Sequence, residues 1–233
     1  MTNPPIILVP GFWLGAWAWD EVAPALRAGG FDVTALTLPG MGSLDDDRSG
    51  IGLQDHVDAI VGAVRAAGPP AVLAVHSGTG FAGYAVTDAI PDQLAAMIYV
   101  DSGPGKGPMD ADQAGDLAFP GLEKLAEDEN LEGIGQERLD EFARRAVPVP
   151  GGVVRDAIDL TNDARLDVPS TMICTAFSAK EYQDAAKEGY AFLAGLDEIR
   201  TLTFVELPTS HWPMWSKPKE LTEIIAGIAS AAS

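Results

Sequence analysis

The chain has 233 residues and a formal net charge of −19, because 34 acidic side chains stand against 15 basic ones. Nucleic acids and anionic membranes are bound through clustered lysine and arginine, so we expect neither as a partner. The single cysteine, Cys174, supports neither a disulfide framework nor a zinc cluster and suits a reducing compartment. The apolar run near the N-terminus is too short for a signal peptide, so we expect a cytoplasmic protein.

Short apolar runs alternate along the chain with segments of helical periodicity. The expected strands are 5–10, 32–39, 71–75, 95–101, 169–177 and 201–207. Helices are expected to end near Ala28, to cover 53–68 and 78–89, and to begin after Ser178 and near Pro218. Because the strands are apolar on both faces, the pattern predicts an α/β fold, a three-layer sandwich with a mostly parallel central sheet.

The alternation breaks between residues 103 and 166. This part of the chain contains turn-rich stretches such as SGPGKGPMD and VPVPGG, and acidic helical stretches such as GLEKLAEDEN and QERLDEFARRA. It predicts a helical cap insertion above the sheet, within a single domain that covers 1–233.

The stretch VHSGTGFAG follows a predicted strand and permits two interpretations. Gly78, Gly80 and Gly83 spell G-x-G-x-x-G, and Asp101 ends the next strand where an acid would contact a ribose. However, dinucleotide folds usually carry this motif on their first strand, whereas here it follows the third. That interpretation also leaves Ser77 without a role.

The second interpretation makes Ser77 a nucleophile on a turn between a strand and a helix. Acyl transfer needs a serine on such a turn, a histidine as base, a carboxylate to orient it and N–H donors for the oxyanion. His211 lies in a loop after the last predicted strand, and Phe12 and Gly78 are placed to supply the N–H donors. The sequence therefore favours serine-based acyl transfer.

With these motifs the chain resembles an α/β-hydrolase, most closely the branch of plant methylesterases and hydroxynitrile lyases. The similarity is densest in VPGFWLGAWAWDEVAPALRAGGFDVTALTLPGMG and returns in VHSGTG, MICT and SHWPMWSKPKEL. It covers about residues 5 to 101 and 169 to 230. The resemblance implies Ser77 as nucleophile, His211 as general base, and Phe12 and Gly78 as oxyanion donors.

Two departures from the family pattern concern the same site. The family has small residues two positions before and after the serine, where this chain has the β-branched Val75 and Thr79. In the family branch, Cys-Thr is followed by Glu-Asp with the catalytic aspartate, but here Ala176 and Phe177 follow instead. The first departure argues for a non-catalytic pocket, and the second leaves the expected acid missing.

Two carboxylates are candidates for the missing acid. Asp101 ends the strand after the nucleophile's helix, a position similar to that of the acid in haloalkane dehalogenases. Glu181 lies just past the family position, but with Ser178 it forms a capping box, which satisfies free N–H groups at a helix start. We expect Asp101 to complete the triad, with Glu181 as the alternative acid.

The remaining histidines and the tryptophans have structural interpretations. His56 is expected to be a surface residue of an amphipathic helix, and His76 to shape the turn beside Ser77. Without a matching acidic cluster, we expect no metal site. Among the tryptophans, we expect Trp13 and Trp212 to line an apolar substrate pocket and Trp17 and Trp19 to pack in the core.

Together these observations predict a cofactor-independent serine hydrolase that acts on a small, largely apolar ester through a Ser-His-Asp triad. The alternatives are a lyase that uses the same triad, a non-catalytic small-molecule binding protein and a nucleotide-dependent oxidoreductase. The expected partner is a small-molecule substrate, and a homodimer remains open as the assembly.

Overall fold

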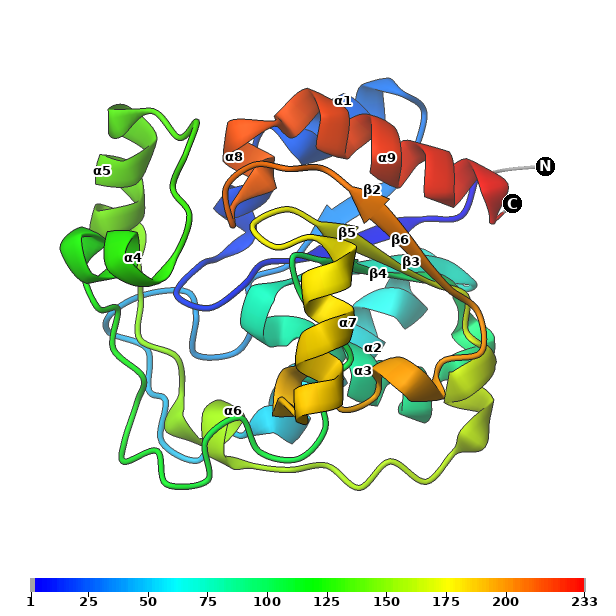
Figure 1. Ribbon diagram of the computed structural model, residues 1–233, viewed down its shortest axis with the longest axis horizontal. Coiled ribbons are helices and arrows are strands. Elements are labelled where there is room, and N and C mark those ends of the chain that lie inside the picture. The colour runs from blue at the N-terminus through cyan, green and yellow to red at the C-terminus, as the bar shows by residue number, and fades with distance from the viewer. Residues whose placement is uncertain (1–2, 233) are drawn as a thin grey trace.

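One six-stranded sheet organises the computed structural model, which describes residues 3–232 (Figure 1). The strands are β1 (Ile6–Val9), β2 (Val33–Ala35), β3 (Ala71–His76), β4 (Leu94–Val100), β5 (Ser170–Cys174) and β6 (Leu202–Glu206). They lie in the order β2-β1-β3-β4-β5-β6, and every neighbouring pair is parallel. The carboxyl ends of all six strands therefore meet at one edge, where ligands bind in open α/β sheets.

Helices cover both faces of the sheet, which confirms the predicted three-layer α/β fold (Figure 1). One face carries α1 (Val22–Ala28), α8 (Pro213–Ser216) and α9 (Pro218–Ala231), and the other carries α2 (Leu53–Ala67), α3 (Gly80–Ala89) and α7 (Ala179–Glu188). Short 3₁₀ turns are η1 (Ala16–Trp19), η2 (Ser77–Thr79), η3 (Pro91–Gln93), η4 (Asp163–Asp167), η5 (Ala191–Leu193) and η6 (Leu196–Glu198).

The hydrophobic core is divided between the two faces. Along β1, Ile7 and Val9 pack with the α2 and α3 side, whereas Ile6 and Leu8 pack with the α1 and α9 side. This alternation follows from the two-residue repeat of a strand. It is why the strands read as continuous apolar runs rather than as alternating ones.

The prediction for His56 is wrong. His56 is 1% exposed, and its Nε2 lies 3.0 Å from the carbonyl oxygen of Pro39, to which the ring donates a hydrogen bond. It follows Leu53 by three residues and precedes Ile60 by four, so it falls on the buried face of α2. Burial lowers its pKa.

The segment 103–166 lies between β4 and β5 and contains α4 (Leu122–Asp128), α5 (Gln136–Arg145) and α6 (Gly151–Arg155). Phe142 of α5 is fully buried against the rings of Trp215 and Trp17, at 5.2 and 6.5 Å between centroids. Trp19 is buried as expected. Trp17, also expected in the core, is only partly buried, and its ring stacks on that of Trp215 and contacts the guanidinium of Arg145.

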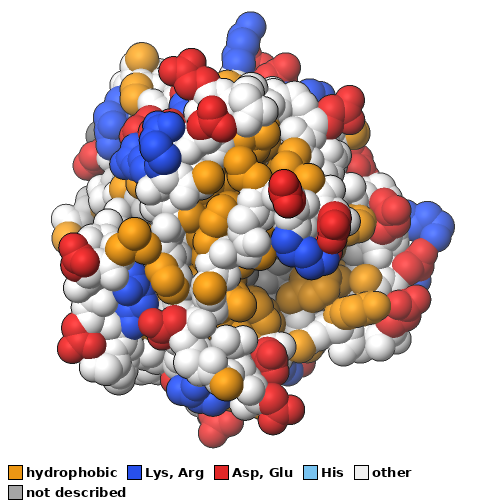
Figure 2. Space-filling model, turned by 90° about the vertical axis from the view of Figure 1, so that its left-hand side faces the viewer, with side chains coloured by type: hydrophobic (Ala, Val, Ile, Leu, Met, Phe, Trp, Pro, Cys, Tyr) orange, Lys and Arg blue, Asp and Glu red, His pale blue; other side chains and the backbone are white. Residues whose placement is uncertain are grey.

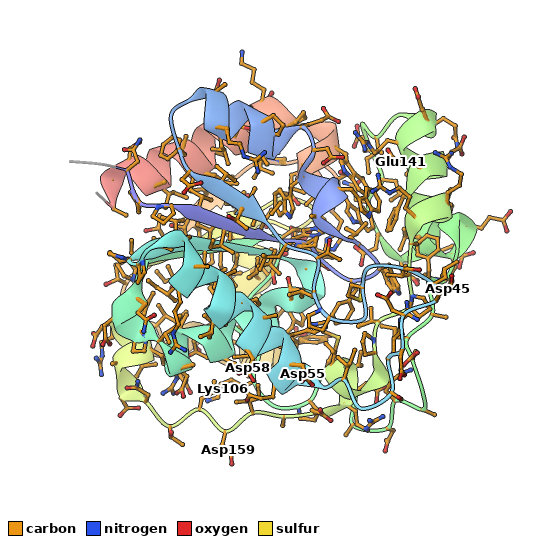
Figure 3. The ribbon with its side chains drawn as sticks, turned by 180° about the vertical axis from the view of Figure 1, so that it is seen from behind. Asp45, Asp55, Asp58, Lys106, Glu141 and Asp159 are labelled. Carbon is orange, nitrogen blue, oxygen red and sulfur yellow. The ribbon has the colours of Figure 1, made fainter. Side chains whose placement is uncertain are left out.

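Charged side chains of α5 lie beside the tryptophans: the guanidinium groups of Arg138 and Arg145 lie over the rings of Trp215 and Trp17. Glu141 accepts hydrogen bonds from Arg138 and Arg145 of its own helix. Figure 3 shows Glu141 and Asp45, from the loop before α2, at the same end of the molecule.

Across residues 3–232, no helix has both the length and the apolar composition needed to cross a membrane.

Candidate active site

Ser77 lies directly after β3, at the turn into η2 and α3. Its φ of 54° is in the left-handed region, which is unfavourable for a residue with a side chain and is tolerated where the surroundings enforce it. Trp13 and Asp101 also have positive φ, at 66° and 40°, and all three residues line one cavity at the carboxyl edge of the sheet. Strained backbone is thus concentrated at one place.

The three glycines of VHSGTGFAG are packed against protein atoms. A Cβ atom on Gly78 would lie 2.7 Å from the Phe12 ring, and one on Gly83 would lie 2.9 Å from Val75. A Cβ on Gly80 would overlap the carbonyl oxygen of Gly103. Close contacts with the Phe12 ring, the Gly103 backbone and β3 therefore account for the three glycines without a bound phosphate.

The β-branched residues beside Ser77 fit into this packing. Val75 is fully buried, and its side chain faces Gly83 on α3, where the missing Cβ leaves room. The Thr79 hydroxyl donates a hydrogen bond to the carbonyl oxygen of His76 at 2.7 Å. Gly83 thus leaves room for the Val75 side chain, and Thr79 is held by its hydrogen bond, so both β-branched residues fit beside Ser77.

Ser77, His211 and Asp101 form a hydrogen-bonded line. The His211 Nε2 lies 2.8 Å from the Ser77 Oγ, and its Nδ1 lies 2.6 Å from Asp101 Oδ2. With neutral His211, Nδ1–H donates to the carboxylate and Nε2 accepts the serine hydroxyl proton. This is the geometry that a serine nucleophile, a general base and an orienting carboxylate require.

The second oxygen of Asp101 is held by the end of β5 and by α7. Its Oδ1 accepts hydrogen bonds from the N–H groups of Thr175 and Ala176, at 2.9 and 3.1 Å, and from the Tyr182 hydroxyl at 2.9 Å. In the family that the sequence resembles, the catalytic aspartate follows the strand that corresponds to β5. Here the residues after β5 instead donate backbone N–H groups to Asp101, which follows β4. No local pattern in the sequence marks Tyr182 as part of the site.

Asp101 and His211 each stabilise the charged form of the other. Burial by itself would raise the pKa of Asp101, but the hydrogen bond and charge of His211, together with the Thr175 and Tyr182 donors, hold it below its ordinary value. Burial would likewise lower the pKa of His211, and Asp101 raises it above 6.5, with a further contribution from Glu129. The arrangement therefore favours an imidazolium that forms against an ionised carboxylate.

Glu181 does not contact His211. Its carboxylate accepts hydrogen bonds from the N–H and hydroxyl of Ser178, at 2.8 and 2.7 Å, so it caps α7 as its capping-box pattern indicates. A different carboxylate, Glu129 at the end of α4, lies 3.8 Å from His211 Nδ1. No sequence pattern marked Glu129, because it lies in the weakly matched segment 103–166.

The loop that carries His211, after β6, is held by two hydrogen bonds. His76 donates from Nε2 to the carbonyl oxygen of His211 at 2.7 Å, and the N–H of His211 donates to the carbonyl oxygen of Asn130 at 3.0 Å. Burial and the neighbouring His211 lower the pKa of His76 to about 3, so it remains neutral. His76 therefore positions His211, consistent with its expected role in shaping the turn.

Phe12 follows β1 and Gly78 follows Ser77, and the Phe12 ring lies against Gly78. The N–H of Phe12 has no acceptor within residues 3–232, and Gly78 lies in the first turn of η2, where N–H groups have no partner within the helix. Both residues line the cavity beside Ser77. Their N–H groups are available to a negatively charged oxygen.

The cavity has a volume of about 770 Å³, within the range of small-molecule sites. Trp13, Trp212 and two side chains of the segment 103–166, Met109 and Leu117, form part of its apolar wall. The other wall comes from residues 177–192, for which no sequence pattern indicates a pocket. Figure 2, which faces the carboxyl edge of the sheet, shows hydrophobic side chains gathered around a hollow.

Metal ligation is not supported by the side chains that surround the cavity. Within residues 3–232, no three His, Cys, Asp or Glu side chains come together as metal ligands would. Cys174 is buried, and burial raises its pKa to about 12, so its thiol is held in the unreactive form.

Comparison with known proteins gives matches in both sequence and structure. Esterase PIR7B of Oryza sativa subsp. japonica is 35% identical over 98 residues, a match that spans 40% of this chain and 37% of that protein. The carbendazim hydrolyzing esterase of a Nocardioides species is 25% identical over 240 residues, spanning 95% of this chain and 98% of that one. A methylesterase of Arabidopsis has a TM-score of 0.78 at 20% identity, covering 98% of this chain and 99% of the other.

The two plant proteins agree with the resemblance to plant methylesterases drawn from the sequence. A family model for the alpha/beta hydrolase family matches residues 6–224. Because this match spans nearly the whole chain, the protein belongs to the α/β-hydrolase family.

Proposed function

We propose that this protein is a serine hydrolase that cleaves a small carboxylic ester with largely apolar groups. The observation that carries the proposal is the continuous line from Ser77 Oγ through His211 to Asp101, at 2.8 and 2.6 Å, at the wall of an apolar cavity. Support comes also from the relatives, several of which are named as esterases.

Each group of the reaction is supplied by the chain itself. His211 Nε2 takes the Ser77 proton as the oxygen attacks the acyl carbon, and the N–H groups of Phe12 and Gly78 bind the oxyanion. His211 then returns the proton to the leaving alcohol, which yields an acyl enzyme. Water, activated by the same histidine, releases the acid and restores Ser77. Asp101 holds the imidazole in the required tautomer throughout.

In this proposal the segment 103–166 forms a cap over the site. Met109, Leu117 and Glu129 of this segment line the cavity, and Asn130 bonds to the backbone of His211. A cap in this position limits water around the reacting ester and shapes the pocket. The cap and the 177–192 wall together would determine which esters fit.

The test is covalent labelling of the active serine. A fluorophosphonate should modify Ser77 stoichiometrically, as mapped by mass spectrometry, and His211→Ala should lose the labelling while keeping its fold. Labelling together with turnover of p-nitrophenyl butyrate supports the hydrolase. Labelling without turnover of any ester favours a lyase on the same triad, and a folded protein that is not labelled favours a binding protein.

A further inference from the structure

The mouth of the cavity is lined by exposed aromatic rings. Among the described residues four large hydrophobic side chains are exposed, and three of them, Phe177, Tyr190 and Phe192, line this cavity. With the buried Tyr182 they form a continuous row, in which neighbouring ring centroids lie 6.0 to 6.5 Å apart. Exposed rings gathered at one opening indicate a surface that a ligand covers.

The charged side chains of the cavity wall are all acidic, apart from the titratable His211. The cavity lining in the described chain contains no lysine or arginine, and its carboxylates are Asp101, Glu129, Glu181, Asp184 and Glu188. Charges of one sign in a cleft with apolar walls raise the local potential and concentrate ligands of the opposite sign.

Three of these five carboxylates are already compensated. Asp101 is bonded to His211 and three donors, and Glu181 is bonded to Ser178. Asp184 pairs with two lysines of its own helix, Lys180 and Lys187. The charge available to a ligand therefore comes from the other two, Glu129 and Glu188.

Of these two carboxylates, Glu129 is the better placed to attract a cation. Its side chain is 32% exposed and accepts no hydrogen bond within residues 3–232, and Nδ1 of the His211 ring, which is neutral in the resting triad, lies 3.8 Å from it. Burial of a carboxylate without donors is unfavourable, and it raises the pKa of Glu129. Glu188 is exposed at the end of α7, next to the aromatic row. A cation bound in the cavity would satisfy both.

We propose that the ester carries a cationic amine or quaternary ammonium group, which binds against the Phe177, Tyr190 and Phe192 rings with Glu129 and Glu188 as counter-charges. Aromatic faces attract such cations, and nearby carboxylates add to the attraction. The inference rests on the proposed ester hydrolysis and specifies its substrate class. It also implies that esters with a free carboxylate are excluded and that an anionic product leaves readily.

The test compares two esters of the same shape, butyrylcholine and 3,3-dimethylbutyl butyrate, which differ in the charge of one quaternary atom. We expect kcat/KM for the cationic ester to be about tenfold higher at low ionic strength, and the ratio to fall as salt is added. In Glu129→Gln and in Glu188→Gln the ratio should fall severalfold toward one. Glu123→Gln, which removes one charge from α4 outside the cavity, should leave the ratio unchanged.

A ratio of one or less, or a ratio that neither variant changes, overturns the cation proposal. If neutral esters are still hydrolysed in that case, the esterase proposal stands. If no ester is hydrolysed and Ser77 is not labelled, the esterase proposal fails. Calorimetric binding of the same two esters to Ser77→Ala then decides the cation proposal alone, because it requires no turnover.

Discussion

Replacement of Asp101 by asparagine tests the proposed triad most directly. The oxygen of the new side chain is expected to remain at the Oδ1 position, because the N–H groups of Thr175 and Ala176 and the Tyr182 hydroxyl all donate there. The amide NH₂ then faces His211 Nδ1 and donates to it, which places the ring proton on Nε2. In this tautomer His211 cannot accept the Ser77 proton.

From this geometry we expect kcat to fall by about 10³- to 10⁴-fold, since the wrong histidine tautomer disables general-base catalysis. That loss corresponds to roughly 4 to 5.5 kcal/mol of transition-state stabilisation. The assay is steady-state hydrolysis of p-nitrophenyl butyrate, with thermal unfolding to show that the variant is folded. KM should change little, because Asp101 faces His211 rather than the ester.

The matched control is Glu181→Gln, which alters the alternative acid and leaves the Asp101 hydrogen bonds intact. It should change kcat by less than about threefold, because capping acts on helix stability rather than on the reacting atoms. A larger loss of kcat in Glu181→Gln than in Asp101→Asn would refute the assignment of the acid.

Three further predictions follow from the same contacts. The raised pKa of His211 means that kcat/KM should increase with pH through a midpoint above 6.5, as His211 becomes neutral, and a pH profile with its midpoint below 6.5 would contradict this. Tyr182→Phe removes one of three donors to Asp101 Oδ1 and should lower kcat about three- to tenfold with KM unchanged, whereas a loss equal to that of Asp101→Asn would indicate a direct role. Phe142→Ala should lower the free energy of unfolding by about 3 to 5 kcal/mol in urea titration, because the ring is fully buried among aromatic side chains, and a change below about 1 kcal/mol would show that α5 does not contribute to the core.

The sequence alone determined the α/β class, the order of its elements and the turn that carries Ser77. Each of these depends on local patterns: apolar runs for strands, a helical repeat for α2, and glycines where α3 packs on the sheet. His211 was also recognisable, because it lies in the loop after the last predicted strand, where the family that the sequence resembles has its general base. The prediction that His56 is exposed failed because amphipathic periodicity does not place the edge of a buried face to within one residue.

Only the tertiary structure decided which carboxylate meets His211. Asp101 and His211 are 110 residues apart in the chain, and they meet because β4 and β6 flank β5 and end at the same edge of the sheet. Tyr182 and Glu129 join them from α7 and from the end of α4, positions that no local pattern ties to the site. Strand order and helix packing bring together residues that are distant in sequence, so the contacts around His211 became visible only in the folded chain.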